Sequence, residues 1–213
     1  MTRILMFAVL CAASALSGCK FVETAELAAR AQASAKPAAG SDIAGRWDGE
    51  VLPYFTQKAK PLAEIKAAVA GGLDAAGKTF GYREVPEGAP WNFPVVVTGT
   101  IVEANTQSRA ATAEVDTDGD GKSDATLQLG PVIKGTSIRD VLPFVSFTSY
   151  ANQIEYAEVA KAFNTQAFER ALKDLPRDKL VGSPVEVVGV FTLRGASDKV
   201  LVTPVSVKLG AGS

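Results

Sequence analysis

Residues 94–99, Pro-Val-Val-Val-Thr-Gly, return with little change at 184–189 as Pro-Val-Glu-Val-Val-Gly. Both runs are rich in β-branched residues and predict strands, the first continuing to residue 102. A glycine inside a strand usually marks a bulge or a tight bend at the corner of a barrel. The repeat therefore predicts two related small barrels, or one barrel built from two similar halves. Chance similarity of two valine-rich strands is the competing interpretation.

Periodicity and stop signals predict the remaining elements. Ile43, Trp47 and Val51 recur at a spacing of four and build one apolar stripe of a helix. Pro53 is expected to interrupt that helix. Residues 74–90, with three glycines and two prolines, are expected to form an irregular connector. Further helices are expected over 58–70, 137–142 and 150–175, and further strands over 110–115, 125–132, 185–193 and 199–208.

These elements predict an α+β chain, mainly β, with an N-terminal helical segment and one long helix. Residues 42–90 form the helical segment and connector, and residues 91–213 form the β-rich body. Before them, residues 1–18 are expected to be a signal peptide. Residues 19–41, rich in alanine and small polar residues, are expected to be a lipidated tether.

The signal peptide is inferred from a charge followed by a short apolar run. Arg3 is followed by apolar or small residues from 4 to 16, too few for a membrane-spanning helix of about 20 residues. The run ends Leu-Ser-Gly-Cys at residues 16–19, which resembles a bacterial lipobox. Lipidation of Cys19 by palmitate-type acyl chains would anchor the protein to the membrane. Lys20 favours the outer membrane; an ordinary signal peptide with an accidental cysteine is the alternative.

The composition excludes much enzyme chemistry. Histidine is absent, which removes the commonest general base and every Ser-His-Asp arrangement. The two cysteines are Cys11 and Cys19, so the body has no disulfide and no thiol nucleophile. Lys and Arg total 22 against 23 Asp and Glu, a balance that argues against nucleic-acid binding. No spacing supports Ser-Lys or paired-carboxylate catalysis, and we expect no enzyme.

The most specific chemical motif is the acidic stretch 116–124, Asp-Thr-Asp-Gly-Asp-Gly-Lys-Ser-Asp. It matches the start of a D-x-D-x-D-G calcium loop, in which alternate carboxylates converge on a hard cation. The predicted ligands of a structural Ca²⁺ are the carboxylates of Asp116, Asp118, Asp120 and Asp124 and the carbonyl of Lys122.

Two observations limit that prediction. Position twelve, where an EF-hand carries a bidentate glutamate, is Leu127, and the flanking segments are expected to be strands. A structural ion in a strand-to-strand loop, with an affinity of about 10⁻⁴ to 10⁻³ M, is therefore expected in place of a helix-opening sensor. The alternative is a solvated Asp-Gly hairpin turn, since the same residues favour turns.

Residues 127–140, Leu-Gln-Leu-Gly-Pro-Val-Ile-Lys-Gly-Thr-Ser-Ile-Arg-Asp, and residues 152–157, Asn-Gln-Ile-Glu-Tyr-Ala, resemble a family of predicted bacterial periplasmic lipoproteins of unknown function. Shorter matching stretches lie at 47–48, 92–93, 108–109 and 203–205. The resemblance covers nearly all of the chain after the signal peptide. It implies a tandem of OB-like barrels and genes often found beside sugar-type ABC uptake systems, but no established activity.

The resembling segments contain a polar cluster with two interpretations. It could bind a sugar or a carboxylate, or it could cap helices and satisfy carbonyls at a barrel end, which we favour. Its members are Arg109, Arg139, Asp140, Asn152 and Gln153. Aromatic residues could likewise stack on a sugar ring but are more often core. These are Trp47, Trp91, Phe144, Phe147, Tyr156 and Phe163.

The sequence therefore predicts a non-enzymatic, lipid-anchored periplasmic protein. The family resemblance implies that its role is an accessory or binding component of a sugar-type ABC uptake system. Its expected partners are the membrane, through the N-terminal lipid, and an ABC transporter or solute-binding protein, but not nucleic acid. The alternative is a calcium-stabilised envelope structural protein without a soluble ligand; a carboxylate-dependent hydrolase is the least favoured.

Overall fold

The structure is a computed structural model that describes residues 39–85 and 88–210. The predicted signal peptide, the lipidation site Cys19 and all but the end of the tether lie outside these ranges. Within the ranges described, no helix is both long and apolar enough to cross a membrane.

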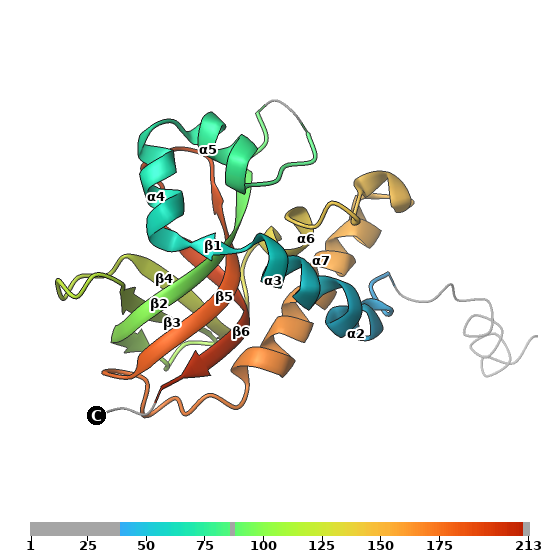
Figure 1. Cartoon of the computed structure of the whole chain (residues 1–213). Coiled ribbons are helices and arrows are strands. Elements are labelled where there is room, and N and C mark those ends of the chain that lie inside the picture. The colour runs from blue at the N-terminus through green and yellow to red at the C-terminus, as the bar shows by residue number, and fades with distance from the viewer. Residues whose placement is uncertain (1–38, 86–87, 211–213) are drawn as a thin grey trace, which may run out of the picture. The chain divides into compact units, whose positions relative to one another are not determined.

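A closed barrel forms the centre of the protein (Figure 1). Its strands are β2 (Trp91–Asn105), β3 (Ala110–Asp116), β4 (Ala125–Pro131), β5 (Pro184–Leu193) and β6 (Leu201–Leu209). The order is β2-β3-β4-β6-β5, and closure follows because β2 is long enough to pair with β5 along its first part and with β3 along its second. β4 and β6 run in parallel, and the other barrel pairs are antiparallel. This is a five-stranded barrel of the OB type.

The two repeated segments are neighbours in this barrel. Antiparallel pairing of β2 with β5 places Val95 opposite Gly189 and Gly99 opposite Val185. The predicted α+β, mainly β fold with an OB-like barrel is confirmed. The described strands form one barrel and not the expected tandem, because the two valine-rich strands pair with each other and every described strand joins one sheet.

The glycines of the repeat stand where strands approach closely. A Cβ atom at Gly99 would lie 2.1 Å from the carbonyl oxygen of Asp116, and one at Gly189 would lie 2.6 Å from that of Thr203. The β5–β6 register shifts beside Gly189, between Val188 and Gly189. Both positions therefore require glycine for contact between backbones, as expected of barrel corners.

The N-terminal helical segment continues past its proline. α2 (Ile43–Arg46), the π-helical turn η1 (Trp47–Val51) and α3 (Leu52–Lys58) follow one another directly. The predicted stripe of Ile43, Trp47 and Val51 is buried, but the interruption expected at Pro53 does not occur. Proline breaks the regular i→i−4 bonding of an α-helix, and here the wider π turn directly precedes it.

The next segment also differs from the prediction. α4 (Leu62–Ala70) begins later than residue 58, because β1 (Lys60–Pro61) pairs in parallel with β2. The connector expected to be irregular contains the helix α5 (Leu73–Phe80). The glycines of this segment argued against a helix in the sequence. The indole of Trp91 packs directly on Gly77, where a Cβ would lie 2.2 Å from the ring. This glycine serves helix packing and does not break the helix.

Between β4 and β5 the chain forms α6 (Ser137–Asp140), the 3₁₀ turn η2 (Phe147–Ser149), α7 (Gln153–Ala167) and the π-helical turn η3 (Phe168–Leu172). The expected long helix is thus confirmed in α7 and η3. It begins at Gln153 because the Asn152 side chain caps it, accepting hydrogen bonds from the amides of Ile154 and Glu155.

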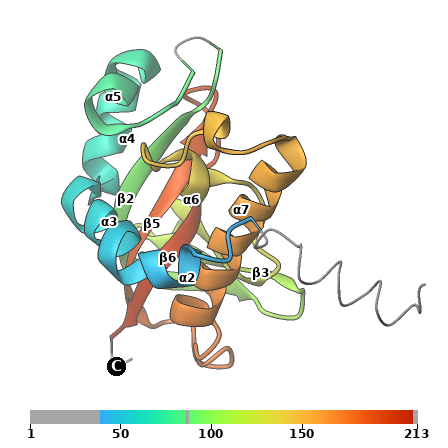
Figure 2. The same cartoon turned by 90° about the vertical axis from the view of Figure 1, so that its right-hand side faces the viewer.

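The buried apolar residues form two clusters. One fills the barrel and reaches α4 and α5. The other joins Val190 and Val205 of the barrel wall to buried residues of α2, α3, α6 and α7. Figure 2 shows these helices beside the barrel. Trp47, Trp91 and Phe163 belong to these cores, as expected. Phe144 and Phe147 are not core, since they remain 39% and 41% exposed. Their rings contact Tyr54 and Tyr156, which pack against the second cluster.

Candidate functional site

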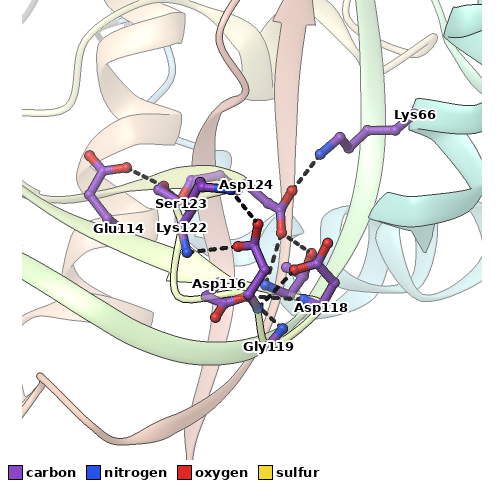
Figure 3. A network of polar contacts seen from close by, with 11 residues as sticks. Lys66, Glu114, Asp116, Asp118, Gly119, Lys122, Ser123 and Asp124 are labelled. Atoms are coloured by element: carbon purple, nitrogen blue, oxygen red, sulfur yellow. Dashed lines mark hydrogen bonds and ion pairs between the residues drawn. The ribbon is translucent and has the colours of Figure 1, made fainter.

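The acidic loop joins β3 to β4, as its strand-like flanks predicted (Figure 3). Oδ1 of Asp116 accepts hydrogen bonds from the amides of Asp118 and Gly119 at 3.1 and 2.7 Å. Its Oδ2 accepts one from the amide of Gly121 at 2.8 Å. These bonds, that from Gly121 first, lower the pKa of Asp116 and keep its carboxylate ionised. The backbone amides of the loop therefore orient the carboxylate of Asp116, the first acidic residue of the motif.

Three of the predicted ligands converge. One carboxylate oxygen from each of Asp116, Asp118 and Asp120 lies within 4.8 Å of the others. Ligand oxygens lie about 2.3–2.6 Å from Ca²⁺, so two on opposite sides of the ion are at most about 5 Å apart. The spacing therefore fits a calcium ion. The ammonium group of Lys122 contacts Asp120 at 3.0 Å.

Asp124, the fourth predicted carboxylate, faces a different partner. Its Oδ1 accepts a hydrogen bond from the Lys66 ammonium of α4 at 2.5 Å. Its Oδ2 accepts from the hydroxyl and the amide of Thr117, at 2.6 and 3.0 Å. The Lys66 bond, aided by those from Thr117, lowers the pKa of Asp124 to about 2. Asp124 therefore fastens the base of the loop to α4.

Leu127, at position twelve of the motif, is buried within β4. The position that carries the bidentate glutamate of an EF-hand therefore points into the barrel core. The expectation that this loop lacks the EF-hand's helix pair is confirmed by the strands on either side of it.

The structure brings two members of the predicted polar cluster together. Arg139 is 9% exposed, and its Nε donates a hydrogen bond to Oδ1 of Asp140 at 2.7 Å. Its Nη2 forms an ion pair with the same oxygen, also at 2.7 Å. Its Nη1 donates to the carbonyl of Tyr156 at 2.9 Å, and its guanidinium carbon lies 3.6 Å from the centre of the Tyr156 ring. Arg139 thus joins α6 to α7, which agrees with the favoured structural interpretation.

The other members of the cluster stand elsewhere. Asn152 is the cap of α7, and Gln153 is its exposed first residue. Arg109 is exposed before β3, where its carbonyl accepts a hydrogen bond from the amide of Val132 at 2.8 Å. These three residues therefore do not join Arg139 and Asp140 in one cluster.

A cavity of about 300 Å³ opens beside Asp140. We call it the aromatic cavity and define it by Tyr82, Asn92, Asp140, Phe147 and Tyr156. Phe147 and Tyr156 meet edge to face, with ring centres 5.3 Å apart. Tyr82 and Asn92 exchange two backbone hydrogen bonds of 2.8 and 3.0 Å. Sequence reasoning named Asp140, Phe147 and Tyr156. It missed Tyr82, which lies in the connector that reads as irregular, and Asn92, which lies in β2.

Burial raises the pKa of both tyrosines in this cavity. For Tyr156 it reaches about 12, against the partly opposing effect of Arg139, and for Tyr82 the nearby Glu84 adds to the rise. Both phenols therefore keep their protons at neutral pH.

Comparison with known proteins supports this architecture. The chain has 17% sequence identity to an OB-fold protein from Thermotoga maritima of known crystal structure, with a TM-score of 0.57 over 71% of this chain and 86% of the other. This similarity shows the fold alone. No curated protein matches the sequence. Residues 9–208 match the sequence model of a family described as predicted periplasmic lipoproteins, DUF2291. The chain therefore belongs to this family of predicted periplasmic lipoproteins.

Proposed function

We propose that this lipoprotein is a non-enzymatic binding or accessory component of a sugar-type ABC uptake system. The observation that carries the proposal is the aromatic cavity, a concave site that combines apolar rings with a few placed polar groups, as small-molecule sites do. The absence of histidine from the whole sequence supports binding without catalysis.

The proposal includes an anchor at the N-terminus. Acyl chains on Cys19 would hold the protein at the membrane, and residues 20–41 would connect them to the barrel. Lys20, directly after the modified cysteine, favours the outer membrane. The barrel and its cavity would then face the periplasm.

Crosslinking in intact cells tests the role. The wild-type protein is crosslinked, purified and compared with Cys19→Ser, which lacks the lipidated residue. We expect recovery of an ABC transporter subunit or a solute-binding protein with the wild type, and at least tenfold less with the variant because the anchor raises the local concentration. Repeated recovery of neither class of protein contradicts the uptake role.

We propose calcium stabilisation as a second function, favoured by the convergence of Asp116, Asp118 and Asp120. A ligand at a hundred times its Kd stabilises the folded state by about 2.7 kcal/mol. For a protein of this size, that corresponds to a rise in Tm of roughly 5–10 °C. We expect this rise for the full chain in detergent at about 10 mM calcium, given a Kd of about 10⁻⁴ M.

Matched variants identify the source of such a rise. Asp118→Ala is expected to abolish it, because it removes one charge and one ligand from the convergent set. Asp178→Asn, an exposed aspartate outside the loop, controls for net charge and should keep it. A melting curve that is the same in calcium and in chelator contradicts the calcium site and leaves the loop as a hairpin turn.

A further inference from the structure

We infer that the aromatic cavity binds an uncharged, hydroxyl-bearing ring the size of a monosaccharide. The inference names the ligand class of the binding role proposed above and rests on that role. Its basis is the combination of exposed aromatic surface, paired charges and unpartnered phenol hydroxyls in one concave site.

The aromatic surface of the cavity is only partly buried by the fold. Phe147 is 41% exposed, so its ring loses part of the benefit that burial would give. It packs edge to face on Tyr156, which leaves ring surface open toward the cavity. Aromatic faces carry negative electrostatic potential and attract the C–H bonds that line one face of a sugar ring. A cavity of about 300 Å³ lies at the small end of the range for ligand sites, which suits a single ring.

The charged groups at the cavity are engaged by the protein itself. Arg83 pairs with Asp74 at 3.5 Å and lies 4.0 Å from the centre of the Trp91 ring. Asp140 is held by Arg139 and by the hydroxyl of Thr136, the latter at 2.5 Å. A carboxylate or phosphate on the ligand would therefore meet no unpaired cation among the described lining residues. The cavity favours a neutral ligand.

Glu84 is also engaged. Its Oε1 accepts hydrogen bonds from the hydroxyl of Ser146 and from the amide of Phe147, the latter at 3.2 Å. This carboxylate links the connector before β2 to η2 and thereby fixes the position of the Phe147 backbone. An anionic ligand would be repelled by it. A wall fixed before binding lowers the entropy cost of association.

Hydrogen-bonding groups remain for the ligand. Within the described residues, the hydroxyls of Tyr82 and Tyr156 have no hydrogen-bond partner, and both keep their protons. Each can donate one hydrogen bond and accept another. A ring with several hydroxyl groups satisfies such a pair while its apolar face lies on the aromatic surface. A purely apolar ligand would leave the phenols unpaired.

Calorimetric titration of the full chain in detergent tests the inference. The probes are D-glucose, D-galactose, D-mannose, D-ribose and myo-inositol, with D-glucuronate as the anionic counterpart of glucose. We expect at least one neutral probe to bind with a Kd of about 1 mM or below, and glucuronate to bind at least tenfold more weakly than the best of them. Absence of binding by every neutral probe, or preference for glucuronate, overturns the inference.

Substitutions test whether the sugar binds in the aromatic cavity. Phe147→Ala and Tyr156→Phe are each expected to weaken it about tenfold, the first by removing ring surface and the second by removing one hydroxyl. Phe144→Ala is the matched control: Phe144 is 39% exposed but contacts Tyr54 outside the cavity lining. Equal affinity in Phe147→Ala and Phe144→Ala overturns the inference. Sugar binding without a transporter partner contradicts only the uptake role, whereas a partner without sugar binding contradicts only the ligand class.

Discussion

Replacing Gly99 with alanine is expected to destabilise the protein by about 3 kcal/mol. The added Cβ would lie 2.1 Å from the carbonyl oxygen of Asp116 and 2.9 Å from the side chain of Val115. The first of these atoms belongs to backbone, so no rotamer change relieves the clash and β3 must move away from β2. Since Asp116 begins the acidic loop, the same movement disturbs the convergent carboxylates. Urea denaturation measures the loss.

Gly45→Ala provides the control for this prediction. Gly45 lies in α2 with no atom within 4 Å of the position of an added Cβ. Alanine is a better helix former than glycine, so this variant should be unchanged or more stable by up to about 1 kcal/mol. A Gly99→Ala protein as stable as Gly45→Ala would show that the two barrel strands do not approach as closely as described.

Replacing Arg139 with methionine is expected to cost about 3 kcal/mol of stability. The change removes the guanidinium that pairs with Asp140, bonds the carbonyl of Tyr156 and stacks on its ring. Breaking a buried ion pair by deleting one member costs about 3–5 kcal/mol, and the lower end applies because the Asp140 side chain is 29% exposed. Denaturant titration at neutral pH checks the value.

Arg109→Met separates this effect from the loss of any arginine. Arg109 is exposed, and the contact of this residue described above is made by its backbone, so the substitution should change stability by no more than about 0.5 kcal/mol. Arg139→Lys should recover only part of the loss, since an ammonium cannot both stack on the Tyr156 ring and donate to the Asp140 carboxylate and the Tyr156 carbonyl. Wild-type stability in Arg139→Met would contradict the structural role of this residue.

Several features followed from local sequence. β-branched runs predicted the barrel strands, and glycines inside them predicted close approach, because strand propensity and the steric cost of a Cβ depend on few neighbours. The D-x-D-x-D-G spacing predicted the convergence of Asp116, Asp118 and Asp120. Each carboxylate accepts a hydrogen bond from an amide two residues further along the chain, so the conformation of the loop depends on local sequence.

Other features depended on pairing between distant segments. The repeated strands were compatible with two barrels or with one. The antiparallel pairing of β2 with β5 shows that they belong to a single barrel. The helix α5 was not predicted because Gly77 indicated a helix break. In the structure Gly77 lies within the helix and leaves room for the Trp91 ring. Asp124 looked like a metal ligand until α4 placed Lys66 beside it.

The sequence by itself predicted the N-terminal lipoprotein signal, the strand content and the acidic loop, and it shows that histidine is absent. Each of these features resides in a contiguous segment or in composition. The tertiary structure alone decided the single barrel, the fastening of the loop to α4 and the aromatic cavity. The cavity joins Tyr82 and Asn92 before and within β2 to Asp140, Phe147 and Tyr156 beyond β4. Side chains so far apart along the chain acquire a shared chemistry only when long-range strand pairing and core packing bring their backbones together.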